Sequence, residues 1–475
     1  MKHVRATIYY NVGVQLASHA GVLLTQLAYI VMVTRSLDLD SFGRFSLAAG
    51  AVQMVLMVSD LGLNVLIVRQ VASSPTSQTA FGQLLFLKTV LAVMFSTLLA
   101  VAGKLWADVE TARVLAVFAA GMLVHSIVLA FGMAFQGSGQ LYISSLTSFV
   151  LAVLQLVFAA VFLWTGGRVI SLGVAYLLAA LITLLLNHFL FTRKIHHLNF
   201  YSGITSSLRY IKQALPLGLG TALNSIANRI DVALLFYLGG AADVGLYAGA
   251  YRITGTLYNV PVGIFAAILP FFSRLSWKTP EMDEILERTL LVAVVSASVL
   301  FLFFVIAGPE VVVWLFGTTY LPAGHLLQIL SWALIPAFIN VGLMHASASQ
   351  KSTAGNYSAA AAMGATTNIV LNLWWIPTSK SRGASYATVA TELVVLGAYL
   401  YLLRREIRAK ALRRPAKALG LALCAYFISW PISLEGILSA LPIVGMYLLL
   451  LFWLGEFSHE DWQFWTRQLA PVTDS

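Results

Sequence analysis

The sequence predicts an all-α polytopic membrane protein with about 14 transmembrane helices. Of its 475 residues, 59% are hydrophobic and only 10% are charged, whereas about a quarter of the residues in a soluble domain are charged. The apolar runs are continuous, which is typical of membrane helices and not of the alternating strands of an outer-membrane barrel. This composition excludes a soluble enzyme and a disordered chain. Cys424 is the single cysteine, which excludes an internal disulfide framework and a multi-cysteine metal site.

Each predicted span is a mostly apolar stretch long enough to cross the hydrocarbon core, which takes about 20 residues. The first span follows Lys2 and Arg5, as the apolar part of a signal peptide would. It is too long for that role and no small-residue cleavage site follows it promptly, so we expect it to remain as a helix. The expected spans cover residues 9–34, 44–71, 82–103, 112–135, 141–164, 169–192, 212–238, 244–272, 286–308, 322–347, 354–376, 383–403, 415–433 and 436–455.

The positions of the basic residues predict that both termini are cytoplasmic. With the N-terminus inside, 20 of the 29 Lys and Arg residues fall on inner segments and 7 on outer segments, as the positive-inside rule requires. Arg229 and Arg252 are the other two, and both lie within predicted spans. An even number of spans is needed to keep this bias.

The loops are too short to fold as separate domains, and this excludes several function classes. No P-loop pattern is present, so an ATP-driven transporter would need a separate ATPase subunit. No Asp-Asp pair or histidine cluster stands at a membrane interface, as a membrane-bound glycosyltransferase or phosphatase would require.

A short internal similarity predicts two lobes. Residues 42–48 resemble residues 244–250, at an offset of 202 residues or six spans. An even offset gives the two copies parallel topology, so we expect two six-helix lobes related by a pseudo-two-fold axis along the membrane normal. The expected parts are an N-terminal lobe (1–192), a cytoplasmic inter-lobe loop (193–211), a C-terminal lobe (212–404), and a basic loop with two appended helices and a cytoplasmic tail (405–475).

Ionisable residues deep in a span are costly and usually face a protein interior or water. At about 1.5 Å per residue, Asp231 and Arg252 lie at similar depth on sequential spans, so they could form a structural ion pair. Arg229 then has no acidic partner nearby in sequence, and a guanidinium binds phosphate through two parallel hydrogen bonds. We therefore expect Arg229 to line a cavity and contact an anionic ligand.

The remaining intramembrane candidates are polar side chains that share helix faces with these charges. Asp60 and Glu392 are candidate proton or cation sites, with pairing to arginines as the alternative, and Asp231 is a candidate for ion coupling or for the ion pair with Arg252. Arg69 and Lys88 lie near cytoplasmic ends, where they can snorkel and form an entrance. His19, His125 and His345 are expected to be hydrogen-bonded packing residues. The candidate substrate-binding residues are Arg229, Arg252, Asn224, Asn228, Asn259, Tyr258, Gln15 and Asn64.

Several short motifs follow one another in order along the chain. They are Arg35-Ser36-Leu37 with Phe42-Gly43, Asp60-Leu61-Gly62, Arg69-Gln70, Arg229-Ile230-Asp231, Val244-Gly245-Leu246-Tyr247, Leu315-Phe316-Gly317, Asn368-Ile369, Asn372-Leu373, Ile376-Pro377 and Gly383-Ala384 with Glu392. Together these motifs resemble those of bacterial polysaccharide flippases. The chain is similar to the polysaccharide transporter family of the multidrug/oligosaccharidyl-lipid/polysaccharide (MOP) superfamily, over nearly all of the first twelve spans. It departs from a typical member in its more basic outer loop, Lys380-Ser381-Arg382-Gly383.

This resemblance implies a flippase that moves undecaprenyl-pyrophosphate-linked oligosaccharide units across the bacterial inner membrane by alternating access. It implies coupling to a proton or Na⁺ gradient and no other cofactor or metal. Expected partners are membrane lipids, a polysaccharide polymerase and a chain-length regulator, with no nucleic acid and a monomeric protein. Alternatives are a cation-coupled multidrug exporter and a peptidoglycan-precursor (lipid II) flippase of the same superfamily. A membrane-embedded polymerase or ligase is disfavoured because such an enzyme carries a large outer loop, so we expect no bond-making chemistry.

Overall fold

A computed structural model describes most of the chain, and the chain divides into two compact units, Met1–Gly245 and Leu246–Ser475. We call these unit 1 and unit 2. The predicted lobe boundaries stay a prediction, because the expected inter-lobe loop lies largely outside the described residues. The described residues are 2–73, 78–194, 209–215, 218, 229–258, 260–262, 265, 268, 272–273, 275–277, 279–350, 352–429, 436–457 and 461.

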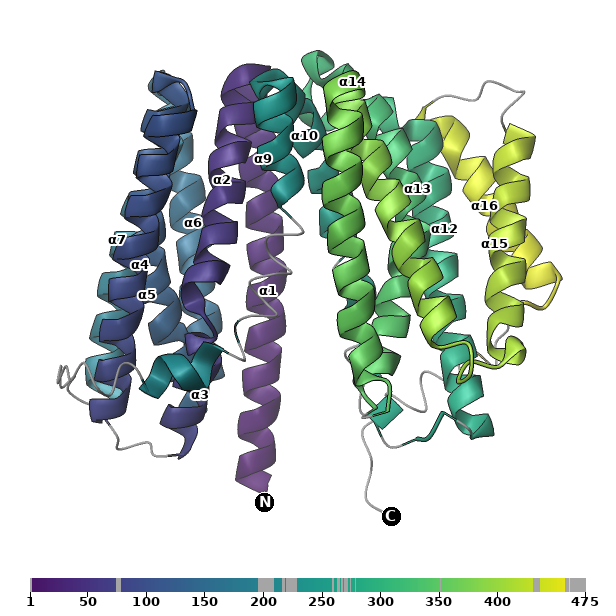
Figure 1. The fold of residues 1–475 in the computed structure, drawn as a ribbon, viewed down its shortest axis with the longest axis horizontal. Coiled ribbons are helices and arrows are strands. Elements are labelled where there is room, and N and C mark those ends of the chain that lie inside the picture. Colours follow the sequence, from purple (N-terminus) through teal and green to yellow (C-terminus); the bar gives the residue numbers. More distant parts are fainter. Residues whose placement is uncertain are drawn as a thin grey trace. The chain divides into compact units, whose positions relative to one another are not determined.

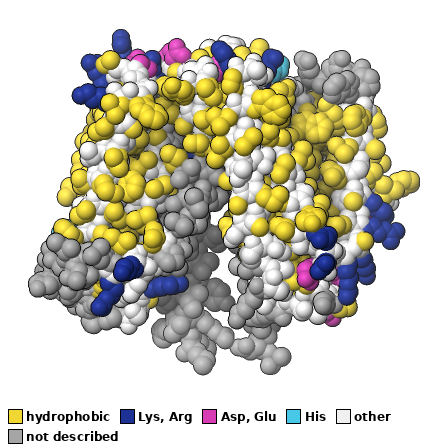
Figure 2. Space-filling view, in the orientation of Figure 1, with side chains coloured by type: hydrophobic (Ala, Val, Ile, Leu, Met, Phe, Trp, Pro, Cys, Tyr) yellow, Lys and Arg dark blue, Asp and Glu magenta, His cyan; other side chains and the backbone are white. Residues whose placement is uncertain are grey.

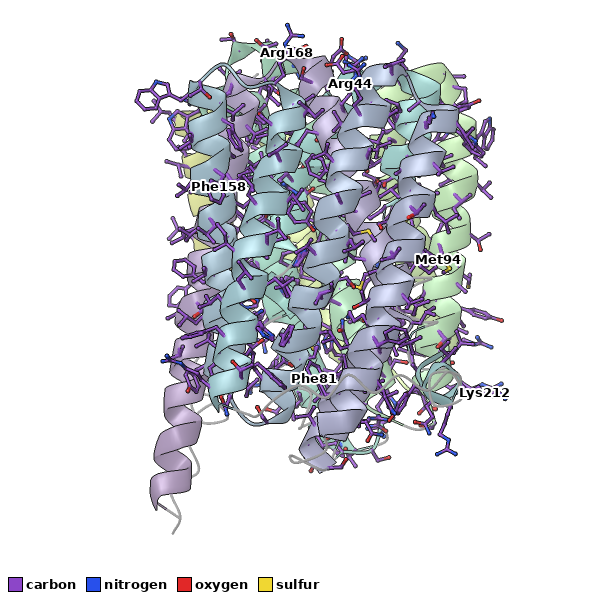
Figure 3. The ribbon with its side chains drawn as sticks, turned by 90° about the vertical axis from the view of Figure 1, so that its left-hand side faces the viewer. Arg44, Phe81, Met94, Phe158, Arg168 and Lys212 are labelled. Carbon is purple, nitrogen blue, oxygen red and sulfur yellow. The ribbon has the colours of Figure 1, made fainter. Side chains whose placement is uncertain are left out.

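Unit 1 is a bundle of long helices that run roughly parallel to one another (Figure 1). Buried aromatic residues fill its core, where Phe81 contacts the rings of Phe131 and Phe191. Arg44 and Arg168 lie at one end of this bundle, and Phe81 and Lys212 lie toward the opposite end (Figure 3). Its helices are α1 (Lys2–Ser36), α2 (Leu39–Asp60), α3 (Leu63–Ser73), α4 (Gln78–Trp106), α5 (Val109–Gly137), α6 (Leu141–Trp164), α7 (Val169–Lys194) and α9 (Ile230–Gly239), while α10 (Ala241–Leu257) begins in unit 1 and continues into unit 2.

Unit 2 is built around two long helices that pack together, α12 and α13. Thr279 begins α12 by accepting a hydrogen bond from the Met282 backbone N–H, with Pro280 in the first turn, an arrangement that suits both residue types. Two helical arms make up α14, and they meet at Lys380. The elements are α12 (Pro280–Phe316), the short 3₁₀ helix η1 (Thr318–Tyr320), α13 (Leu321–Ala348), α14 (Ala354–Leu402), α15 (Ala409–Ser429) and α16 (Ile437–Trp453).

The predicted fold class is confirmed: the protein is an all-α, multi-pass membrane protein. Within the described residues, nine helices are long and apolar enough to cross a membrane, and Gly355–Leu402 among them contains two predicted spans. Hydrophobic side chains cover much of the face seen in Figure 2, and most of the Lys and Arg side chains visible there lie near the helix ends. This is the surface expected of helices in lipid.

The second predicted span, 44–71, is wrong as a single continuous helix. It is interrupted at Leu61 and Gly62, whose φ angles are +46° and +86°, so that α2 ends at Asp60 and α3 begins at Leu63. A side chain at Gly62 would overlap the backbone of Ala214 and Gly218. The close approach of these residues explains why the break needs a glycine.

The two glycines of the sequence similarity, Gly43 and Gly245, make reciprocal contacts. A Cβ atom added to Gly43 would overlap the carbonyl oxygen of Ala241, and one added to Gly245 would lie 2.5 Å from the carbonyl oxygen of Leu39. Leu39 and Ala241 are separated by the same 202 residues as the two glycines. The first turns of α2 and α10 therefore pack closely against each other, and the two glycines make this approach possible.

Ionic contacts join the helix ends of unit 1. Asp108 caps α5 by accepting a hydrogen bond from the Thr111 backbone N–H at 3.0 Å. Arg44 of α2 lies 3.7 Å from Asp108 and also pairs with Glu110. Burial alone would raise the pKa of the Asp108 carboxyl, but the hydrogen bonds from Thr111 and the charge of Arg44 outweigh it and hold this pKa below its ordinary value.

An ionic cluster attaches the last two helices of unit 2 to α12. Asp461, beyond α16, accepts hydrogen bonds from Arg414 of α15 at 2.6 Å and from Arg288 of α12 at 3.0 Å. The hydrogen bond to Asp461 raises the pKa of Arg414 against the opposing effect of burial. Arg408 similarly pairs with Asp283 of α12 at 2.9 Å. Part of the basic stretch from Arg404 to Lys417 therefore has partners within the protein.

Candidate functional site

A buried ion pair lies at the break between α2 and α3. Lys88 of α4 is 1% exposed, and its Nζ donates to Asp60 Oδ1 at 2.7 Å and also to Asn64 Oδ1. The backbone N–H of Asn64 donates to Asp60 Oδ2 at 3.3 Å. Asp60 thus accepts hydrogen bonds from the first turn of α3 and from α4, and the three side chains join α2, α3 and α4.

This geometry differs from the predicted role of Lys88 at a cytoplasmic entrance. A snorkelling lysine keeps its ammonium in water, whereas the Lys88 ammonium is enclosed and neutralised by Asp60. Burying two charges costs desolvation energy, which good geometry and additional hydrogen bonds offset. Arg69, which was grouped with Lys88, is exposed on α3. Asp60 therefore forms an ion pair in this structure, but its partner is Lys88 and not an arginine as predicted.

Unit 2 holds a second carboxyl group with a different surrounding. The Asn340 amide of α13 donates to Glu392 Oε2 at 2.8 Å and to the Glu392 carbonyl oxygen at 3.0 Å. Within the described part of the chain, no Lys or Arg forms an ion pair with Glu392. Tyr258 and Tyr399 lie close enough to interact with Glu392 electrostatically. Two predicted site residues, Tyr258 and Glu392, therefore lie in the same part of unit 2.

Near Glu392 there are also buried side-chain oxygens that accept no hydrogen bond from the described residues. Asn340 Oδ1 and Thr391 Oγ1 are buried and have no hydrogen-bond partner in the described part of the chain. Tyr247 shares a 3.0 Å hydrogen bond with Thr388, one turn before Glu392, and its ring stacks on Tyr251 at 5.5 Å. Buried oxygens with spare lone pairs beside a carboxyl group are suited to a proton, a water or a monovalent cation.

The predicted arginine site is described in part. Arg229 precedes α9 at its N-cap position and is partly exposed, and Asp231 is buried in the first turn of that helix. Asp231 Oδ1 accepts a hydrogen bond from the Val232 backbone N–H at 2.8 Å, and an acidic residue is favourable at a helix N-terminus. Arg252 lies partly buried on α10. Its pairing with Asp231 stays a prediction.

The other predicted residues divide by position. Gln15 and His19 are exposed on α1. His125 Nδ1 lies 2.7 Å from the Tyr176 hydroxyl, and His345 Nδ1 lies 2.8 Å from the Val341 carbonyl oxygen, so both act as hydrogen-bonded packing residues as predicted. Three predicted asparagines lie outside the described residues: Asn224, Asn228 and Asn259.

Asn340 and Thr391 are the site residues that the sequence analysis missed. Asn340 is a single amide in the middle of the apolar span 322–347, and a polar residue at that depth is itself a signal. Its importance becomes visible only when α13 and α14 are packed together. No periodicity within one helix could have indicated that contact.

Comparisons with known proteins identify the family and the fold. A family model described as "Polysaccharide biosynthesis protein" matches residues 8–276, more than half of the chain. The chain belongs to this family. A comparison with curated proteins finds no match.

Solved structures of MOP superfamily transporters share the fold. The lipid II flippase MurJ in an inward closed conformation has a TM-score of 0.73 at 11% identity, covering 92% of this chain and 99% of that chain. An inward-facing multidrug resistance MATE family transporter has a TM-score of 0.64 at 15% identity, covering 81% and 94%. A MOP superfamily transporter from Pyrococcus furiosus has a TM-score of 0.59 at 17% identity, covering 84% and 95%. At these identities the likeness shows the fold, which is that of MOP superfamily transporters.

Proposed function

We propose that this protein is a flippase for an oligosaccharide linked through pyrophosphate to a polyprenyl lipid such as undecaprenol. The observation that carries the proposal is the combination of a polysaccharide biosynthesis family match with the fold of a lipid II flippase over nearly the whole chain. A protein of that family with multiple membrane spans is suited to moving a lipid-linked glycan between leaflets. The proposed membrane is the bacterial inner membrane, with both termini cytoplasmic.

The charge of such a substrate determines what the protein has to supply. A pyrophosphate cannot cross hydrocarbon unaided, and a guanidinium can bind it through paired hydrogen bonds. Arg229 and Arg252 are proposed to bind the pyrophosphate, with Tyr258, Asn64 and the predicted asparagines as hydrogen-bonding groups for the sugar. The prenyl chain is proposed to stay in lipid while the two lobes alternate in access.

Glu392 is the proposed coupling site for an ion gradient. Its hydrogen-bond partner, the Asn340 amide, is neutral and cannot balance the charge of the carboxylate. Because an unbalanced charge inside the membrane is costly, we propose that a proton or Na⁺ neutralises it. Asp60 is less suited to this role because Lys88 already neutralises it. A polymerase and a chain-length regulator are the proposed partners.

The test is complementation of a strain that lacks its polysaccharide flippase. Arg229→Ala is expected to abolish surface polysaccharide while the protein still inserts at the parental level, and Arg229→Lys is expected to retain part of the activity because it keeps the charge. The control is Arg168→Ala, which removes an exposed arginine at a helix end of unit 1 (Figure 3). Full export by Arg229→Ala would defeat the assignment of this residue.

A lipid II flippase is the second candidate, favoured by the structural likeness to MurJ over 99% of that chain. It moves the same chemical class of substrate, and the two functions differ in their consequence for the cell. Depletion of a lipid II flippase should cause lysis, whereas depletion of a polysaccharide flippase should remove surface polysaccharide from intact cells. Lysis upon depletion would favour the second candidate.

A further inference from the structure

The two arms of α14 enclose a pocket of about 410 Å³ near the turn that joins them. This volume falls within the range of about 300–1,000 Å³ that is usual for small-molecule sites. The pocket lies wholly within unit 2, and its lining residue Leu393 directly follows Glu392 in α14. Its walls are mostly aromatic and aliphatic, with hydroxyls on Ser379 and Tyr386, and they are formed by Trp375, Ser379, Tyr386, Val389, Ala390 and Leu393.

The pocket opens onto an apolar surface that membrane lipid can reach. Tyr386 and Leu393, which line it, are 48% and 54% exposed, and the neighbouring Trp374 is 69% exposed. The ring of Trp375 stands edge-on to Tyr386 at 6.5 Å and stacks on Trp374. Tryptophan and tyrosine are typical of helix ends at the level of lipid headgroups. The position and walls of the pocket therefore suit an apolar chain entering from the headgroup level.

Two cationic side chains stand at the same end of the hairpin. Lys380 and Arg382 are both exposed, and they belong to the seven basic residues expected on outer segments, where the positive-inside rule disfavours them. Lysine and arginine bind lipid phosphates at membrane surfaces. The apolar pocket is thus suited to a hydrocarbon chain, and the two cations are suited to a phosphate.

The backbone conformation of the turn is unusual for a lysine. Lys380 has φ 47° and ψ −124°, a conformation that favours glycine and strains an L residue. A Cβ atom at Gly383 would overlap the backbone of Trp375, so the turn is tight and a glycine is used where space demands it. Strained residues collect at binding sites, so the conformation of Lys380 marks this turn as a candidate site.

We propose that this hairpin binds an anionic phospholipid of the outer leaflet, with one acyl chain in the pocket and the phosphate at Arg382 and Lys380. Its evidence is separate from that for the proposed flippase function, and it requires no transport. A neutral phospholipid offers the chain without a net headgroup charge and should bind more weakly.

Native mass spectrometry of the purified full chain can test the headgroup part. With equal phosphatidylglycerol and phosphatidylcholine, we expect the protein to retain several times more phosphatidylglycerol. Lys380→Ala with Arg382→Ala should remove that preference. The matched control, Lys104→Ala with Arg113→Ala, removes two exposed cations of the predicted outer segments of unit 1 and should keep it. Equal losses in both double variants, or no preference in the parent, would overturn the proposal.

Two further measurements separate the lipid from other ligands. Soluble glycerol phosphate should not displace the lipid; displacement would mean that the hairpin binds phosphate alone and overturns the proposal of a lipid site. Phosphatidylglycerol with brominated chains should quench the tryptophan fluorescence of the parent more than that of Trp375→Phe. Equal quenching would show that no chain enters the pocket and would also overturn the proposal.

Discussion

The two compact units each hold a carboxyl group inside a membrane-spanning helix, and they surround it differently. In unit 1, Asp60 is 2.7 Å from the Nζ of Lys88, which is almost completely buried. In unit 2, Glu392 accepts a hydrogen bond from the neutral amide of Asn340 at 2.8 Å. A buried ion pair needs both charges, whereas an amide can accompany a carboxyl group in either protonation state. From this difference we expect the carboxylate of unit 1 to be structural and propose that the carboxyl group of unit 2 exchanges its proton or cation.

The largest expected effect comes from removing the lysine of unit 1. Lys88→Met keeps most of the side-chain volume but leaves Asp60 without its cation, and breaking a buried ion pair in this way costs about 3–5 kcal/mol. We expect a large fall in the apparent melting temperature of the purified protein and in the amount of inserted protein. Thermal unfolding in detergent, monitored by size-exclusion chromatography, measures the melting temperature. The yield of folded protein from isolated membranes measures the amount inserted.

The double variant Lys88→Met with Asp60→Asn is the control for this prediction. Replacing both charges removes the uncompensated carboxylate, so most of the lost stability should return. A single variant as stable as the parent would contradict the interpretation of a structural pair. A double variant no better than the single one would show that the loss comes from packing around Lys88.

The sequence predicted the architecture well because hydrophobicity and loop charge are properties of single segments. The span expected at 141–164 matches α6 (Leu141–Trp164) residue for residue. The break at Leu61 and Gly62 was missed because it depends on the close approach of Ala214 and Gly218, which are about 150 residues away in the chain. Local apolar patterning carries no signal for such a contact.

The candidate site was harder to predict, because it depends on which helices are neighbours. The intramembrane charges Asp60 and Glu392 were visible in the sequence as polar residues in apolar runs. Their partners, Lys88 and Asn340, come from other helices. Lys88 was assigned to a surface role because its distance from the end of a span can be counted, whereas its burial requires packing. The depth of a charged residue in the membrane can therefore be predicted from the sequence, whereas the side chain with which it pairs cannot.

The second effect tests the exchangeable charge of unit 2. Glu392→Gln has nearly the same shape, and its side-chain carbonyl can still accept the Asn340 hydrogen bond, so we expect little loss of stability. If transport is coupled through this carboxyl group, export should fall by about tenfold, the scale of an ordinary coupling free energy, and lose its dependence on pH. Export measured across a pH series checks this.

Glu281→Gln provides the matched control for this prediction, since it makes the same substitution at an exposed position of unit 2. It should leave both stability and the pH profile of export unchanged. A Glu392→Gln variant that exports normally with the parental pH profile would remove Glu392 from the coupling role. A variant that unfolds like Lys88→Met would instead make Glu392 structural, and the contrast between the units would disappear.

The smallest effect is expected at an exposed ionic contact of unit 1, which separates the contribution of burial from that of pairing. Asp108 is 49% exposed and 3.7 Å from Arg44. Asp108→Ala should therefore lower the free energy of unfolding by about 1 kcal/mol, mostly because α5 loses its N-cap. Asp108→Ser should lower it less, because serine can still cap the helix. Since the pKa of the folded-state carboxyl lies below its ordinary value, this contribution is present above about pH 4 and is lost as the pH falls through the folded-state pKa. Melting temperatures of the three proteins should therefore converge in acid. If Asp108→Ala costs as much as Lys88→Met, burial cannot be what distinguishes the Asp60–Lys88 pair.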